Sequence, residues 1–336
     1  MVYQFKIFIY SICLIVCSES LLAQTVNLLS SGTKSSLRGL SVVNDRIIWV
    51  SGSNGMVGKS IDSGKTFIWQ VVKDYEKTEF RDIEAFNDST ALIMGIASPA
   101  YILRTTDGGV NWKKVYENNN PGMFLDAMEF LDSQNGIVIG DPLEGRIFIA
   151  KTFDGGSTWK DIPLQNNPIA DSGEAFFASS GTNIRKFNQQ EAVFVSGGLS
   201  SHLFIKGKKI PLPIIQGKQS TGANSIAVKN NKMLIVVGGD FNTKDSNINN
   251  CFITKNAGKD WYAPEIPLHG YRSCVEWLNK NNWISCGLNG VDFSKDDGNT
   301  WNWISKESYH VCRKSKNGKS VFFAGNGGRI GKLIDF

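Results

Sequence analysis

The apolar residues of this chain fall in short runs that are separated by glycine-rich polar turns. Residues 137–139 (Ile-Val-Ile) and 235–237 (Ile-Val-Val), for example, lead directly into one and two glycines, respectively, and then an aspartate. No long stretch carries apolar residues at the spacing of one helix face. Short apolar runs bounded by turn residues are typical of buried strands. The pattern therefore predicts an all-β protein.

Composition supports this class and limits the partners. The chain has 336 residues, with 34 Gly and only 9 Pro, which suits many strands joined by tight turns. Lys and Arg total 36 against 31 acidic residues, a formal net charge of +5, and the basic residues are spread along the chain. A nucleic-acid-binding protein usually shows a basic stripe. We therefore expect no nucleic acid partner and attribute the charge to solubility.

One octet recurs with the pattern S/T-x-D-x-G-x-T-W, and its copies begin at Ser60, Thr105, Thr152, Thr254 and Ser294. In such a turn the carboxylate and hydroxyl oxygens accept hydrogen bonds from backbone amides. The glycine supplies a positive φ, and the aromatic residue packs back between strands. We therefore expect a structural and not a catalytic role for Asp62, Gly64, Asp107, Gly109, Trp112, Asp154, Gly156, Trp159, Asn256, Gly258, Trp261, Asp296, Gly298 and Trp301.

The spacing of the octets predicts the number of repeats. Successive copies lie 45, 47, 102 and 40 residues apart, counted at the Asp or Asn position. The long interval must contain one copy without an octet, which we place at residues 193–206. Together with a recurring strand and glycine turn, this defines seven units that begin near residues 48, 91, 136, 192, 232, 283 and 321. A period of roughly 40–50 residues with four short strands per unit predicts a seven-bladed β-propeller.

The two ends of the chain are expected to meet. The last unit stops at residues 333–336, before its fourth strand, whereas residues 25–30 form a strand that belongs to no unit. We predict that the N-terminal strand completes the seventh blade. Such pairing would close the ring and leave no exposed sheet edge. The propeller would then occupy residues 24–336.

Residues 1–23 have the pattern of a signal peptide. Lys6 precedes an apolar run from Ile7 to Val16, which is too short to cross a bilayer, and Ala23 offers a small residue before a cut ahead of Gln24. We expect export to the periplasm or the extracellular space. The mature chain is expected to have no transmembrane segment and to be a monomer.

Four cysteines follow this segment: Cys251, Cys274, Cys286 and Cys312. If residues 277–283 span a hairpin turn, Cys274 and Cys286 face each other across it. This pair is the candidate for a disulfide, which an exported protein can form. An equally strong reading is that the cysteines are small buried apolar residues.

The octet resembles the Asp box of sialidase-type repeats, and the whole pattern resembles the bacterial BNR-repeat proteins. Within these, nearly all of the mature chain is most similar to the photosystem II stability/assembly factor family and its non-photosynthetic relatives. The residues that carry the resemblance are 36–41, 80–84, 124–127, 140–142 and 270–273. The resemblance implies a seven-bladed propeller that assists assembly or holds a protein partner, and it does not imply photosynthesis.

A candidate ligand site follows from the propeller architecture, because first strands line the central channel and ligands usually lie at one of its mouths. Aligning the expected first strands places Arg38, Arg81, Leu125, Glu174, Asn224, Arg272 and His310 at one level, followed by Asp82 and Asp126. We expect these groups at the mouth opposite the octets, flanked by loops 95–101, 140–146 and 238–251. They would bind an anion or a sugar, or neutralise one another as a buried polar plug.

An enzyme is the alternative to a binding scaffold for a protein or carbohydrate. Sialidases hold a substrate carboxylate with three arginines and use a Tyr/Glu nucleophile pair with an acidic Asp. The matching groups here would be Arg38, Arg81, Arg272, Tyr271, Glu174 and Asp82. Sialidase propellers have six blades, however, and their arginine-containing N-terminal motif is missing. We therefore expect a non-catalytic scaffold, with glycoside hydrolysis of an anionic sugar as the second hypothesis.

Metal and cofactor chemistry has little support in the sequence. His202, His269 and His310 are the only histidines, and they lack metal-ligand spacing. The glycine-rich runs are strand turns and not phosphate loops between a strand and a helix. We expect neither a metal nor a cofactor.

Overall fold

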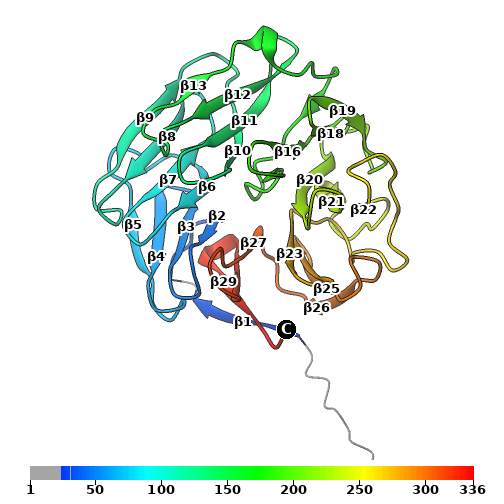
Figure 1. Cartoon of the computed structure of the whole chain (residues 1–336). Coiled ribbons are helices and arrows are strands. Elements are labelled where there is room, and N and C mark those ends of the chain that lie inside the picture. Colours follow the sequence, from blue (N-terminus) through cyan, green and yellow to red (C-terminus); the bar gives the residue numbers. More distant parts are fainter. Residues whose placement is uncertain (1–23, 31) are drawn as a thin grey trace, which may run out of the picture.

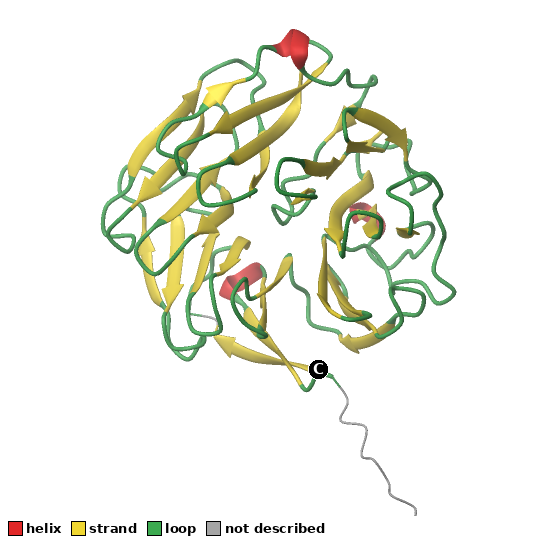
Figure 2. Cartoon of the chain, in the orientation of Figure 1, coloured by secondary structure: helices red, strands yellow, loops and turns green. Residues whose placement is uncertain are grey.

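Seven antiparallel sheets are arranged around a central axis (Figures 1 and 2). The structure is a computed structural model that describes residues 24–30 and 32–336, so the expected signal peptide at residues 1–23 lies outside the described residues. Besides strands, the described chain has three short 3₁₀ helices: η1 (Leu164–Asn166), η2 (Phe241–Thr243) and η3 (Asn326–Gly328). None of its helices is long and apolar enough to span a membrane. The predicted all-β, seven-bladed propeller is confirmed.

Four blades are each built from four consecutive strands, and the predicted unit starts coincide with their second strands. These blades are one, two, three and six. Their strands are β2 (Leu37–Val42), β3 (Ile48–Gly52), β4 (Met56–Ser60), β5 (Ile68–Val71); β6 (Phe80–Ala85), β7 (Ala91–Gly95), β8 (Ala100–Thr105), β9 (Lys113–Asn118); β10 (Leu125–Phe130), β11 (Gly136–Leu143), β12 (Arg146–Thr152), β13 (Lys160–Asp161); and β23 (Cys274–Asn279), β24 (Asn282–Gly287), β25 (Gly290–Ser294), β26 (Asn302–Ser305).

Blades four and five depart from this scheme. Blade four consists of β15 (Ile184–Lys186), β16 (Ala192–Val195), β18 (His202–Ile205) and β19 (Lys208–Pro211). Blade five contains β20 (Thr221–Val228), β21 (Leu234–Asp240) and β22 (Cys251–Thr254), and its sheet is extended by the two-residue strands β17 (Gly197–Gly198) and β14 (Glu174–Ala175). A tight turn at Lys206 and Gly207, both with positive φ, replaces the octet between β18 and β19.

The seventh blade is assembled from both ends of the chain. β27 (Val311–Lys314), β28 (Val321–Ala324) and β29 (Ile330–Ile334) come from the C-terminal region, and β1 (Thr25–Ser30) pairs antiparallel with β29. Figure 1 shows the blue strand β1 beside the red strand β29. Val26 and Leu29 pack against a core cluster that also contains residues of blades one, six and seven. The predicted closure of the ring by the N-terminal strand is confirmed.

The octets form one repeated hydrogen-bond pattern. In the first, Asp62 Oδ1 accepts hydrogen bonds from the Ser60 hydroxyl at 2.8 Å and from the Thr66 amide at 3.0 Å. Asp62 Oδ2 accepts from the Thr66 hydroxyl at 2.6 Å, and Ser60 Oγ accepts from the Gly64 amide at 3.0 Å. The turns at Asp107, Asp154, Asn256 and Asp296 repeat these bonds with the residues available.

The octet glycines also contact the preceding blade. Gly156 has φ +77, and a Cβ built on it would lie 2.3 Å from a methyl carbon of Leu92 in blade two. Gly109 meets Trp49 of blade one in the same way, and Gly298 meets Ile235 of blade five. The glycine is therefore required twice, once for its backbone conformation and once because the neighbouring blade lies against it.

Removing the strand that closes the ring should destabilise the protein. Deletion of residues 24–34 exposes the edge of β29 and the core under Val26 and Leu29. We expect the melting temperature to fall by about 10 °C, measured by circular dichroism. Leu28→Thr, at a side chain that is 61% exposed, is the control and should change it little. An unchanged melting temperature after the deletion would contradict closure by β1.

A matched glycine pair separates backbone strain from contact between blades. Gly156→Ala should lower the free energy of unfolding by about 2–4 kcal/mol, because it adds steric overlap to left-handed strain. Gly207→Ala, at φ +68 with no atom near the added Cβ, should cost only about 1 kcal/mol. Urea unfolding of both variants measures the difference, and equal losses would show that the blade contact contributes nothing.

The octet carboxylates should make stability depend on acidity. Hydrogen bonds from the Thr66 hydroxyl and amide lower the pKa of Asp62 to about 2, and the Asn111 amide and side chain lower the pKa of Asp107 to about 2. Because the unfolded value is about 3.9, their contribution is present above about pH 4 and is lost as the pH falls through 2. The double variant Asp62→Asn with Asp107→Asn should therefore be less stable than the parent at pH 6, with a difference that shrinks between about pH 4 and 2. A difference independent of pH in acid titrations would argue against these bonds.

Candidate functional site

The channel has two mouths, and all seven blades contribute residues to each. The first strands end at the octet face, where the Ser63 amide of the first octet donates to Arg46 O, in the turn that follows β2, at 3.0 Å. A cavity of about 740 Å³ lies at that mouth, and one of about 380 Å³ lies at the opposite mouth, where the first strands begin. Of the predicted site residues, four line the smaller cavity: Arg38, Arg81, Asn224 and His310.

Two arginines give the smaller cavity its positive charge. Arg38 Nη1 donates to Ser179 O at 3.2 Å, and among the described residues no carboxylate forms an ion pair with it. Arg81 Nε lies 3.6 Å from Glu79 Oε2 and has no hydrogen-bond partner. Burial, together with the nearby Arg81, lowers the pKa of Arg38. Burial, with Arg38 and Arg81, also lowers the pKa of His310 to about 3, so its imidazole is neutral at physiological pH.

Aromatic residues form much of the remaining wall. Phe177 and Phe241 meet edge to face at a centroid distance of 5.8 Å, and Phe241 meets Tyr271 at 6.3 Å. The Tyr271 hydroxyl donates to Asn224 Oδ1 at 2.7 Å. The cavity therefore combines partly buried guanidinium groups with apolar surface, an arrangement suited to an anionic group that carries an apolar substituent.

Apart from Glu79, which pairs with Arg81, the acids near the cavity do little to neutralise these arginines. Asp141 lines the cavity, and its Oδ1 accepts from the Phe176 amide at 2.8 Å. Burial raises the pKa of Asp141. Burial and Asp141 also raise the pKa of Asp126 well above its usual value, although Arg81 opposes this. Asp141 and Phe241 come from two of the loops expected to flank the mouth, but the sequence alone did not single out either residue.

Four predicted site residues do not line this cavity. Asp82 is buried between blades, where its carboxylate accepts from the Ile83 and Met128 amides, and burial raises its pKa to about 7 although Arg313 opposes the rise. Asp126 is fully buried. Glu174 accepts from Ser196 and Lys209 and pairs with His202. Arg272 is fully buried and its Nε donates to Asp292 Oδ2 at 2.7 Å.

Of the seven residues expected at one level of the channel, three do not lie there: Leu125, Glu174 and Arg272. In blades one, two, three and five the first strand has a bulge at the same place, and the bulged residues are Arg38, Arg81, Asp126 and Asn224. Leu125 and Arg272 each lie one residue before the position that corresponds to Arg38. Their backbone amides donate to the preceding blade, as does the amide of Leu37, which is the residue before Arg38. Glu174 is not on a first strand at all, because the first strand of blade four is β15. A bulge shifts the register by one residue, which the apolar pattern does not reveal.

The groups proposed for a sialidase-like reaction are therefore not assembled. Arg272 is held inside blade six by Asp292, so it cannot complete a clamp with Arg38 and Arg81. Tyr271 is bonded to Asn224, whereas Glu174 is bonded to Ser196, His202 and Lys209. The nucleophile pair of the glycosidase hypothesis does not form.

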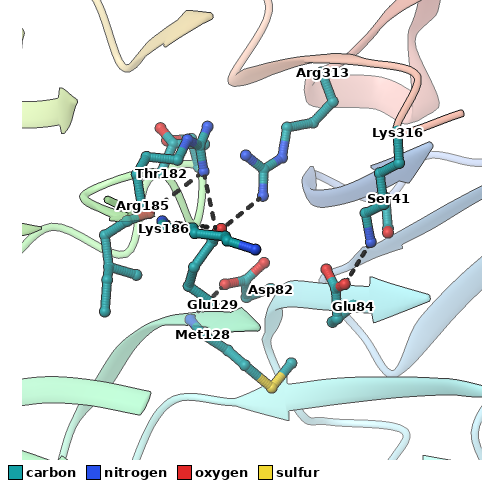
Figure 3. Close-up of polar contacts among 12 residues, drawn as sticks. Ser41, Asp82, Glu84, Met128, Glu129, Thr182, Arg185, Lys186, Arg313 and Lys316 are labelled. Atoms are coloured by element: carbon teal, nitrogen blue, oxygen red, sulfur yellow. Dashed lines mark hydrogen bonds and ion pairs between the residues drawn. The ribbon is translucent and has the colours of Figure 1, made fainter. Parts of the chain in front are cut away.

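The cavity at the octet-side mouth is lined by ion pairs (Figure 3). Arg185 Nη2 lies 3.1 Å from Glu276 Oε2, and Arg185 Nη1 lies 3.8 Å from Glu129 Oε2. Arg313 spans the same two glutamates at 3.8 and 3.9 Å. Lys316 pairs with Glu84 beside them. One interpretation of the predicted site residues was that they neutralise one another as a buried polar plug. The structure has mutually neutralising charges at the other end of the channel, and they belong to residues that the sequence pattern did not indicate.

The four described cysteines outside residues 1–23 are free and buried. Cys274 and Cys286 are directly opposite in the β23–β24 register, as the sequence predicted, but the expected disulfide is not formed. The Cys274 thiol instead donates to Cys312 O of the neighbouring blade at 3.2 Å. The alternative reading, that these cysteines are buried, agrees with the structure.

Solved structures share the propeller fold at low sequence identity. The structure of YCF48 bound to D1 peptide matches with a TM-score of 0.63 and 16% identity over 94% of this chain and 97% of that chain. YCF48 from Cyanidioschyzon merolae gives 0.65 and 17% over 92% and 98%. The Pan2 WD40 domain from Neurospora crassa gives 0.60 and 12% over 92% and 94%. No protein-family model and no curated protein matches the sequence. The chain is thus similar in fold to a photosystem II assembly factor and to WD40 propellers.

Proposed function

We propose that this chain is a non-catalytic binding scaffold that holds a protein partner through an anionic segment at the mouth opposite the octets. The observation that carries the proposal is Arg38, which lines a cavity of about 380 Å³ beside Arg81 and has no carboxylate paired with it among the described residues, whereas Arg81 pairs with Glu79 at 3.6 Å. Guanidinium groups bind carboxylates strongly in partly buried sites.

The apolar wall of the cavity indicates the chemical group that the ligand carries beside its anionic group. Phe177, Phe241 and Tyr271 can pack against an apolar side chain next to the anionic group, and such aromatic anchors carry much of the energy of protein recognition. A peptide segment offers both groups within a few ångströms. An anionic sugar would also need polar partners for its hydroxyl groups, and here the Tyr271 hydroxyl is already bonded to Asn224 Oδ1. The cavity therefore favours a peptide over the carbohydrate hypothesis.

The comparisons with solved structures support the proposal of a protein or peptide partner. One of the similar folds is a YCF48 structure bound to a D1 peptide, and others are WD40 propellers. We propose that the chain is a non-photosynthetic relative of the assembly factors that the repeat pattern resembles. We also propose that residues 1–23 direct its export, so that the partner is a periplasmic or extracellular protein.

A charge-matched pair of variants tests the site. The full chain is used as bait in extracts of the cell envelope of its source, and retained proteins are quantified by mass spectrometry. Arg38→Gln with Arg81→Gln should reduce retention of the partner at least tenfold, a loss of about 1.4 kcal/mol or more. Arg46→Gln with Lys65→Gln removes two charges from the octet face and should retain the partner. Equal retention by both variants would overturn the site, and retention should also weaken as salt is raised.

A further inference from the structure

Three cysteine side chains from two blades converge in the core between blades six and seven. Cys274 lies on β23 and Cys286 on β24, while Cys312 lies on β27 of the next blade. The Cys312 and Cys274 sulfurs are 3.6 Å apart, and all three sulfurs lie within 4.8 Å of one another. Each side chain is completely shielded from solvent. The arrangement is fixed by the sheets, because the Cys312 amide also donates to Cys274 Sγ at 3.4 Å.

The spacing of these sulfurs matches a three-coordinate metal ion. With a metal–sulfur distance of about 2.3 Å, sulfurs at the corners of a planar triangle lie about 4 Å apart. This value falls between the Cys274–Cys312 separation of 3.6 Å and the upper bound of 4.8 Å for the cluster. The existing side-chain positions could therefore surround one ion with sub-ångström adjustments.

The donor set selects the kind of ion. Among the described residues the cluster has no histidine or carboxylate as a fourth ligand, and its complete burial leaves no solvent-exposed coordination position. Structural zinc sites take four ligands. Thiolates favour soft ions such as Cu(I), which is stable with three sulfur ligands. The site thus fits Cu(I) better than zinc, and hard ions such as magnesium or calcium would be excluded.

Charged side chains of both signs surround the cluster. Arg185 and Arg313 act electrostatically on Cys274, and Arg272 acts on Cys286. These guanidinium groups are paired with Glu129, Glu276 and Asp292. The assignment of the site therefore depends on the geometry and chemistry of the three sulfurs and not on compensating charge.

We propose that Cys274, Cys286 and Cys312 form a buried three-sulfur site for Cu(I) that fastens blade six to blade seven. Binding of Cu(I) displaces thiol protons to solvent and requires no change in the oxidation state of sulfur. The site lies in the blade core and makes no use of the arginine cavity, so it stands independently of the proposed binding function.

The test compares copper uptake by matched cysteine variants. The full chain is reduced, kept anaerobic and titrated with Cu(I) against a chromophoric Cu(I) chelator. The parent and Cys251→Ser, which alters a buried cysteine outside the cluster, should each bind one more Cu(I) per chain than Cys274→Ser, Cys286→Ser or Cys312→Ser. Cys13 and Cys17 are present in every protein and cancel in the comparison. Copper should raise the melting temperature of the parent and of Cys251→Ser only.

X-ray absorption of the copper-loaded parent decides the question even if the cluster variants fail to fold. Three sulfur neighbours at about 2.3 Å would support the site, whereas nitrogen or oxygen neighbours would overturn it. Equal copper uptake by folded Cys274→Ser would overturn it as well. So would a disulfide between any two of the three cysteines in protein isolated from its natural source, because one remaining thiol could not hold the ion.

Discussion

The pairing of β1 with β29 is the interaction on which the rest of this structure depends. Blade seven is the blade that joins the two ends of the described chain, so its outer edge is closed by a strand from the opposite end of the sequence. Each blade of a ring packs against its two neighbours, and an open ring would leave two apolar faces and one sheet edge exposed. Val26 and Leu29 cover that core.

The arginine cavity includes residues from both blades that meet where the ring closes. Arg38 begins blade one and His310 begins blade seven, and the two blades are joined there by the Leu37 amide, which donates to Gly325 O at 3.1 Å. Ser36 Oγ and His310 Nε2 are 3.2 Å apart across the junction. Closure of the ring therefore positions the site as well as stabilising the fold, and loss of β1 would be expected to disturb both.

The two ends of the channel use similar charges for different purposes. At the octet face, Arg185 and Arg313 share Glu129 and Glu276, so each buried charge has an opposite partner. At the other face, the Ser179 carbonyl is the one hydrogen-bond acceptor of Arg38 among the described residues, and burial raises the pKa of the nearby Asp141. The charges at the octet face are paired internally, which is why we propose the opposite face as the one that binds an anionic partner.

Local features of the sequence determined the architecture of this protein. The octet turns are formed by hydrogen bonds between residues close in sequence, as between Asp62 and Thr66, so the number and spacing of the octets predicted the number of blades. The strand at residues 25–30, which belongs to no repeat, predicted that the N-terminal strand closes the ring. Tertiary structure decided the site. A bulge places Asp126, and not Leu125, at the level of Arg38. Arg272 is buried in its blade, where its guanidinium donates to Asp292. Cys312 of the next blade contacts Cys274. These outcomes depend on register and on partners distant in sequence, for which a local pattern carries no signal.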